Sequence, residues 1–124
     1  MARELEYSLS FKYQKANGKA WEESFLAMTE TIAGNVAINN RISVGITEEA
    51  MALGEVTAAG GFLVIHNEDD TNYVEYRTGT GASNDAVKIP PRKAVAFFVG
   101  SDTTAPYLIA NTAACIVEYW LIVD

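Results

Sequence analysis

Large apolar residues alternate with polar residues at the start of the chain. They are Leu5, Tyr7, Leu9, Phe11 and Tyr13, each separated from the next by one polar residue. A period of two is typical of a β-strand that buries one of its faces. The dipeptide Asn17-Gly18 comes next, and it tolerates the positive φ angles of a tight turn. Because Trp21, Glu23 and Phe25 then alternate with smaller or polar residues, we predict a return strand and a β-hairpin.

The same alternation runs from 36 to 46, interrupted by Asn40, and it predicts a third strand, or two strands that bend at Asn39-Asn40. Residues 47–53 favour a helical turn, because Thr47 can cap it and acidic residues follow. They equally fit a loop that ends in a strand edge. Six more apolar segments bounded by turn residues predict strands at 62–65, 73–77, 87–89, 94–99, 107–109 and 115–123. We expect the first two of these to form a second hairpin through a polar connection.

Eight or nine short strands with almost no helical periodicity predict an all-β fold. A chain of 124 residues buries one core and not two, so we expect a single domain over residues 1–124. The expected architecture is a two-sheet β-sandwich of jelly-roll or immunoglobulin-like topology, and the pattern does not decide between these two. A small barrel is a weaker alternative.

Composition and charge narrow the function. Hydrophobic residues make up 49% of the chain, which is typical of a folded protein rather than a disordered tail. The net charge of −7 would repel a nucleic acid or an anionic membrane, so we expect neither as a partner. The single cysteine, Cys115, cannot form an internal disulfide, and we expect folding in a reducing cytoplasm. The N-terminus lacks the pattern of a signal peptide, and no apolar run is long enough to span a membrane.

Candidate catalytic chemistry is sparse. The one histidine, His66, would act either with Cys115 as a thiol nucleophile pair or with Glu68 as an acid/base pair. No nucleophile signature and no third orienting group accompany either pair. We therefore expect a protein that is not an enzyme, with no catalytic residue and no cofactor.

The acidic segment Glu68-Asp69-Asp70 concentrates oxygen ligands of the kind that calcium prefers. Its spacing differs from that of a helix–loop–helix calcium site, so we expect a solvated loop and no metal, and the sequence leaves bound calcium open. The run that begins Gly79-Thr-Gly-Ala lacks the lysine and the following helix of a phosphate loop. We expect a flexible surface loop over residues 78–85.

Four aromatic residues are candidates for an interaction surface. Tyr7 and Phe11 belong to the long alternating strand at the N-terminus, whose edge we expect to add to the sheet of a neighbour or to bind another protein. Tyr73 and Tyr76 fall on opposite faces of one strand, so one of the two is expected to face outward. An outward tyrosine is a candidate stacking platform for a glycan.

The second half of the chain contains four distinctive runs: Leu53-Gly54-Glu55-Val56, Gly61-Phe62-Leu63 leading to Asn67, Asp70-Thr71-Asn72-Tyr73-Val74-Glu75, and the run from Tyr107 to Cys115. Together they resemble segments of small virion-associated proteins of tailed bacteriophages. The resemblance covers residues 51–124 and consists of strand and turn residues, not of a catalytic signature. It implies a β-sandwich packed into the particle, and it assigns no chemistry to individual residues.

The leading expectation is therefore a non-enzymatic virion structural protein, made in the host cytoplasm. It would decorate or cement the head shell by binding the major capsid protein or another virion protein as a symmetric dimer or trimer. The alternative is a tail, neck or fibre accessory that binds a glycan or another virion protein. The least favoured function is a small hydrolase that uses His66.

Overall fold

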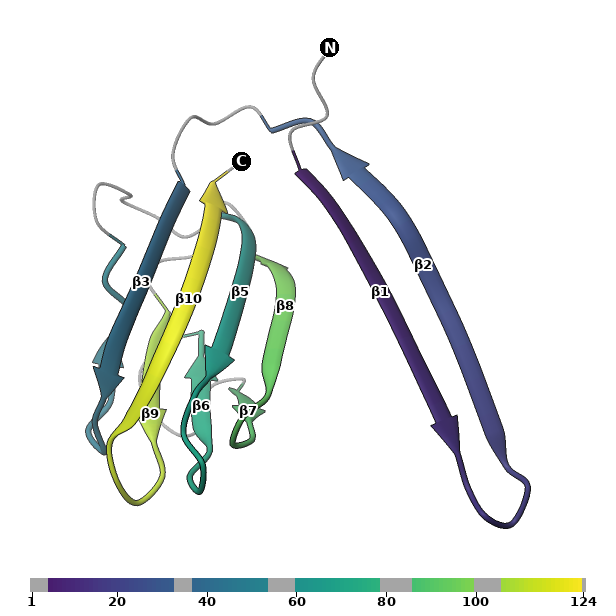
Figure 1. Cartoon of the computed structure of the whole chain (residues 1–124). Coiled ribbons are helices and arrows are strands. Elements are labelled where there is room, and N and C mark those ends of the chain that lie inside the picture. Colours follow the sequence, from purple (N-terminus) through teal and green to yellow (C-terminus); the bar gives the residue numbers. More distant parts are fainter. Residues whose placement is uncertain (1–4, 33–36, 54–59, 79–85, 100–105, 124) are drawn as a thin grey trace. The chain divides into compact units, whose positions relative to one another are not determined.

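The computed structural model describes residues 5–32, 37–53, 60–78, 86–99 and 106–123 (Figure 1). The regular elements of these residues are all β-strands, which confirms the predicted all-β fold. Contacts between residues divide the chain into two units, Met1–Ala33 and Gly34–Asp124. The first unit is a hairpin and the second a sandwich, and each is described by itself.

Two four-stranded antiparallel sheets form the sandwich. The long-stranded sheet has the order β3-β10-β5-β8, and the short-stranded sheet has the order β4-β9-β6-β7. The strands are β3 (Ala37–Val44), β4 (Glu49–Ala50), β5 (Gly61–Asn67), β6 (Val74–Arg77), β7 (Ala86–Ile89), β8 (Ala94–Val99), β9 (Tyr107–Ala110) and β10 (Cys115–Val123). The predicted two-sheet sandwich is thereby confirmed.

The strands of the sandwich pair in a nested order. The first pairs with the last (β3 with β10), the second with the seventh (β4 with β9), the third with the sixth (β5 with β8), and the fourth with the fifth (β6 with β7). A long antiparallel hairpin that is rolled up on itself gives this order, which is that of a jelly roll. Of the two topologies that the sequence left open, the strand order therefore matches the jelly roll.

Three local predictions are decided by these pairings. The expected second hairpin between 62–65 and 73–77 is wrong, because β5 and β6 lie in different sheets and the polar segment between them crosses the sandwich. Residues 47–53 contain the two-residue strand β4 rather than a helical turn, which fits the loop alternative. The third strand is continuous, without a bend at Asn39-Asn40.

The core lies between the two sheets. Its fully buried members alternate along each strand, and include Val44, Leu63, Ile65, Val74, Ile89, Leu108, Val117, Tyr119 and Leu121. Asn40 interrupts the apolar alternation of β3 because it has a polar partner. Its Nδ2 donates a hydrogen bond to the hydroxyl of Tyr119 over 3.2 Å. That hydroxyl in turn donates to the carbonyl of Ala52. The hydroxyl of Tyr119 thus has hydrogen-bond partners inside the core.

The first unit is a hairpin of β1 (Leu5–Gln14) and β2 (Ala20–Glu30), as predicted. Its tip differs from a two-residue turn. The amide of Gly18 donates to the carbonyl of Lys15 over 3.1 Å, and the amide of Lys15 donates to the carbonyl of Lys19 over 2.8 Å. Of Asn17-Gly18, Gly18 alone has a positive φ, at 92°. The turn is therefore a three-residue loop that ends in a left-handed glycine.

A bulge in β2 keeps the hairpin amphipathic. The register passes from Tyr7↔Met28 to Leu9↔Phe25, so β2 has an extra residue at this level. Ala27 has a φ of 54°, and its amide donates to Ser8 Oγ over 3.1 Å. A shift of one residue exchanges the two faces of a strand. The extra residue therefore keeps Met28 on the same face as Phe25, opposite the odd-numbered residues of β1.

We expect the two faces of β10 to differ in their contribution to stability. Leu121 is fully buried, so Leu121→Ala should lower the free energy of unfolding by about 2–5 kcal/mol. Ile116 lies on the opposite face and is 38% exposed, so Ile116→Ala should cost about 1 kcal/mol or less. Urea unfolding of both variants measures the difference. Equal losses would contradict the assignment of the two faces.

Candidate interaction surfaces

The outer face of the short-stranded sheet carries a cluster of paired charges, with Tyr107 and Ile109 in the rows of Arg77 and Glu75. Arg77 bonds to Glu48 over 2.6 Å and to Glu75 over 3.1 Å, and all three side chains are less than 20% exposed. The ammonium of Lys88 lies 4.8 Å from the ring centre of Tyr73, within the range of a cation–π contact. The charged and aromatic groups of this face are thus largely engaged with one another.

The outer face of the long-stranded sheet is apolar over its centre. The pairing of β10, β5 and β8 places Trp120, Val64 and Ala96 in one row across the sheet. The adjacent row holds Ile122, Phe62 and Phe98, with the two phenylalanine rings 5.1 Å apart. Trp120 is 36% exposed and Phe98 53% exposed. These six residues are called the sandwich patch below.

One sequence signal anticipates the sandwich patch. The last strand, from Cys115 to Val123, is apolar at nearly every position rather than at alternate positions. Such a strand is typical of a sheet that is covered on both faces. The sandwich covers only the inner face, so the outward residues Trp120 and Ile122 lie at the surface. We did not predict Ile122 as part of an interaction surface from the sequence.

Polar side chains border the patch where β5 ends. Glu118 accepts a hydrogen bond from Asn39 Nδ2 over 3.0 Å. Arg41 holds Glu68 through two hydrogen bonds of 3.0 and 3.1 Å, and this contact lowers the pKa of the Glu68 carboxyl. His66 shares a row with Glu118 and is half-buried. The outer face therefore has an apolar centre and a charged end.

The hairpin has a second apolar surface. The face formed by the odd-numbered residues of β1 and their partners on β2 carries exposed side chains of Leu9, Phe11, Tyr13, Trp21 and Phe25, with the acidic residue Glu23 opposite Phe11. The rings of Tyr13 and Trp21 stack with centres 5.3 Å apart. The other face carries Ser10 opposite Ser24 and an ion pair of Lys12 with Glu22 at 3.8 Å. The five apolar residues are called the hairpin face below.

The four aromatic residues predicted to form an interaction surface differ in their exposure. Phe11 belongs to the hairpin face and is 49% exposed, and Tyr7 lies on the same side and is half-buried. Tyr73 is half-buried under Lys88. Tyr76 is 3% exposed and contacts Phe97 edge to face, and burial raises the pKa of its hydroxyl. The prediction that Tyr76 belongs to an interaction surface is therefore wrong, because its strand position points into the core.

The structure separates the candidate nucleophile pair. His66 lies in a row with Glu118 on the outer face of the sheet, whereas Cys115 points into the core with 1% exposure. Burial, and secondarily the charge of Asp69, raise the pKa of the Cys115 thiol, which disfavours the reactive thiolate. The structure thus separates the thiol pair, and in the acid/base pair the carboxylate of Glu68 is engaged in an ion pair with Arg41.

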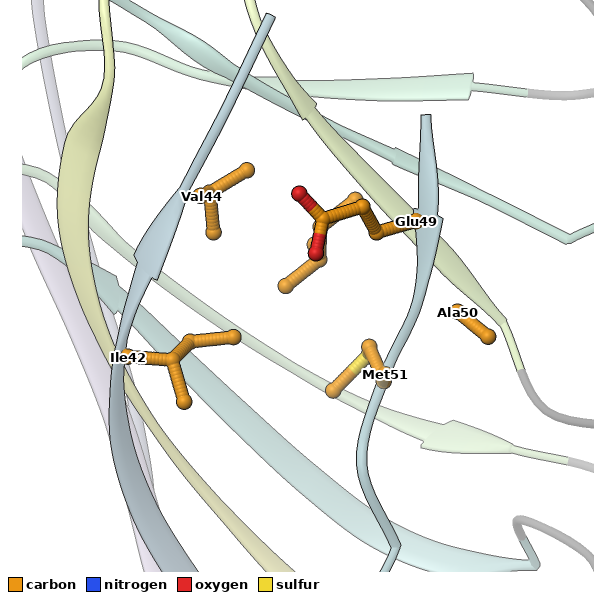
Figure 2. Close-up of a pocket in the computed structure, with 6 residues that line it drawn as sticks. Ile42, Val44, Glu49, Ala50 and Met51 are labelled. Carbon is orange, nitrogen blue, oxygen red and sulfur yellow. The ribbon is translucent and has the colours of Figure 1, made fainter. Parts of the chain in front are cut away.

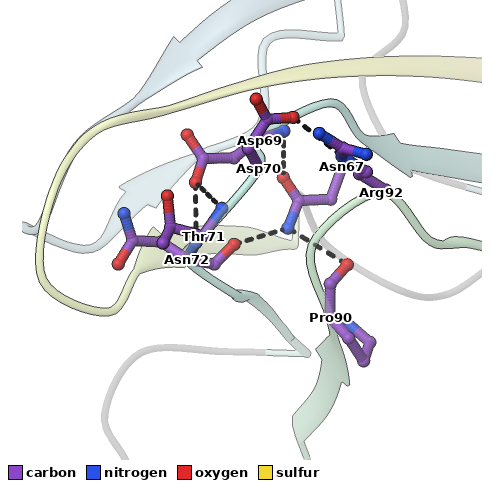
Figure 3. A network of polar contacts seen from close by, with 7 residues as sticks. All are labelled: Asn67, Asp69, Asp70, Thr71, Asn72, Pro90 and Arg92. Atoms are coloured by element: carbon purple, nitrogen blue, oxygen red, sulfur yellow. Dashed lines mark hydrogen bonds and ion pairs between the residues drawn. The ribbon is translucent and has the colours of Figure 1, made fainter.

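The carboxylates of the acidic loop are directed to different partners, and Figure 3 shows the contacts of Asp69 and Asp70. Glu68 binds Arg41, and Asp70 binds Arg92 over 2.8 Å. Asp69 accepts the amides of Asn72 and Thr71 over 2.6 and 2.9 Å. Among the residues that the structure describes, no three His, Cys, Asp or Glu side chains converge as a metal site requires. The loop 78–85 lies largely outside the described residues.

Buried Asn67 organises the same loop. Its side chain is fully buried, and its Nδ2 donates to the carbonyls of Asn72, Ile89 and Pro90 over 2.9, 3.0 and 3.3 Å. Its Oδ1 accepts the amide of Asp69 over 3.0 Å. These bonds join the end of β5 to the end of β7 in the other sheet. The polar loop therefore has a structural role at the crossing between the sheets.

A recess between β3 and β4 has a cavity volume of about 10 Å³ (Figure 2). Its lining residues are Ile42, Val44, Glu49, Ala50, Met51 and Leu108. Ligand pockets for small molecules typically hold roughly 300–1,000 Å³. The recess is smaller than this range and has one carboxylate, that of Glu49, among apolar neighbours.

Comparisons with protein-family models, with curated proteins and with solved structures found no match. In the described part of the chain, no helix has the length and apolarity that a membrane crossing requires.

The acidic loop predicts a specific pH dependence. Hydrogen bonds from the amides of Asn72 and Thr71 lower the pKa of Asp69 below its ordinary 3.8. A lowered pKa in the folded state stabilises the fold above the ordinary pKa, and the stabilisation is lost as the pH falls through the lower native value. Asp69→Asn removes this titration, so wild type should be the more stable protein at pH 7 and lose its advantage below about pH 3.8. Unfolding in urea from pH 7 to pH 2 tests this, and an advantage that persists undiminished at pH 2 would contradict it.

Proposed function

We propose that the chain is a non-enzymatic structural protein of a tailed-phage virion. In this proposal it is a decoration or cement protein, and its sandwich patch binds the head shell. The protein would act as a symmetric multimer, because several weak contacts to one lattice add to a large avidity.

The contrast between the two outer faces of the sandwich carries the proposal. On one sheet Arg77, Glu48 and Glu75 are paired among themselves. On the other sheet, Trp120 and Ala96 are exposed within an apolar patch. Contiguous apolar surface on a soluble domain is typical of a protein-binding site. An apolar core with a polar rim, here formed by Arg41 and Glu118, is also the usual anatomy of a protein interface.

Two further observations support a virion role. The resemblance of residues 51–124 to small virion proteins includes runs that fall on β5, β6 and β9. Jelly rolls also occur among viral capsid domains, although lectins and cupins share the architecture. A fold by itself does not determine function. The proposal therefore rests on the sandwich patch, and the jelly-roll fold is only consistent with it.

A charge placed in the sandwich patch should abolish binding to the shell. Ala96 is exposed on the edge strand β8, so Ala96→Glu adds a carboxylate to the patch without removing a core contact. Burying that unpaired charge at an interface should weaken binding about a hundredfold or more. The measurement is cosedimentation of the purified chain with head shells that lack it, taken from the phage that encodes it.

The matched control is Ala114→Glu, which adds the same charge at an exposed position before β10. It should bind as wild type does. Equal binding by the Ala96→Glu and Ala114→Glu variants would exclude the patch as the docking surface. Failure of wild type to bind the shell would overturn the decoration role, and binding to tails instead would assign the protein to the tail or neck.

A further inference from the structure

The hairpin needs a partner to be stable. Among the described residues, β1 and β2 pair only with each other. An isolated two-stranded hairpin is at best marginally stable in water. This one also exposes large apolar side chains, with Trp21 at 58%, Leu9 at 57% and Phe11 at 49%. A natural sequence keeps such a surface exposed only at a cost in solubility, so the hairpin face is expected to be covered in the working protein.

We propose that the partner is the hairpin of a second copy of this chain. The two hairpin faces pack against each other, antiparallel, around a two-fold axis. This inference rests on the proposed function, because it names how the symmetric multimer forms and leaves the sandwich patch for the shell.

The amount of apolar surface fits a pair of hairpins. A fully exposed large side chain presents about 150–250 Å². At their exposed fractions, the five residues of the hairpin face therefore leave about 500 Å² uncovered. Two such faces would bury about 1,000 Å², which reaches the lower limit for a specific protein interface. The sheet-on-sheet contact also resembles the packing of a β-sandwich, in which apolar faces interdigitate.

The charges of the hairpin select the antiparallel arrangement. The tip, residues 14–20, carries Lys15 and Lys19 and no acid, whereas the paired strand ends at the base carry Glu6 and Glu30 and no base. A parallel pair would place lysines beside lysines and glutamates beside glutamates. An antiparallel pair places the lysines of each tip beside the glutamates of the other base, which is complementary.

The two-fold axis should pass near the middle of the ribbon. Leu9 is the fifth of the ten residues of β1 and pairs with Phe25 on β2. In an isologous contact, residues on the axis meet their own copies. Leu9 of one copy should therefore lie near Leu9 of the other.

The first test is the oligomeric state of the purified full-length chain by sedimentation velocity over a range of concentrations. Wild type should be a dimer. The Phe11→Ser/Phe25→Ser variant should dissociate at least about tenfold more readily. The control is Leu26→Ser, because Leu26 falls at the bulge, has no partner in the register that defines the hairpin face and is 71% exposed. A monomeric or trimeric wild type, or equal dissociation of the Phe11/Phe25 and Leu26 variants, would overturn the proposal.

The second test leaves the apolar residues of the hairpin largely in place. Leu9→Cys should form a disulfide between two copies under mild oxidation, and Ser10→Cys, on the opposite face, should not. The native Cys115 is buried and should not interfere. Absence of the crosslink at residue 9, or equal crosslinking at residue 10, would overturn the face-to-face arrangement.

These tests separate the inference from the proposed function, because they use the purified chain without particles. A dimer that does not bind the head shell would overturn the decoration role and keep the hairpin pairing. A monomer that binds the shell through the sandwich patch would overturn the hairpin pairing and keep the decoration role.

Discussion

A sandwich of two sheets can bury only one face of each sheet, and the central strand β10 is apolar on both of its faces. Val117, Tyr119 and Leu121 fill the core with essentially no exposure. Their neighbours Trp120 and Ile122 must then lie on the outside, since no third layer exists among the described residues of the sandwich. The same strand that stabilises the fold thereby creates the surface that we propose as the docking site.

The hairpin shows the same constraint in a stronger form. A two-stranded ribbon has no interior, so its apolar side is exposed however well its own strands pair. Both units of the chain thus have an apolar face at their surface. We infer a division of labour in which the hairpin joins copies of the protein and the sandwich binds the shell. Such a multimer gains avidity on a repeating lattice without requiring any single strong contact.

The sequence predicts local structure well, because alternation and turn residues report local geometry. The strands of the hairpin, the continuous β10 and the all-β fold were all predictable on this basis. The pairing of β5 with β8 was not, since a polar loop such as 67–72 marks a turn without specifying the sheet to which the chain returns. Likewise, alternation placed Tyr73 and Tyr76 on opposite faces, and only the packing against Phe97 identified Tyr76 as the buried one.

The sites were less predictable than the fold. Acidic residues that looked like a cation loop are held by Arg41, Arg92 and backbone amides, and such partners come from distant segments. Exposed apolar residues are also difficult to distinguish from core residues in a sequence, as Trp120 illustrates. The sequence does show that β10 has more apolar positions than the inner face of a two-layer fold can bury.

Electron cryomicroscopy of the intact phage particle tests the central claim most directly. We expect jelly-roll density on the head shell, with the β3-β10-β5-β8 sheet turned toward the capsid surface and its Trp120 side covered. Density for the chain with that sheet face turned to solvent, or absence of the chain from the head, would contradict it.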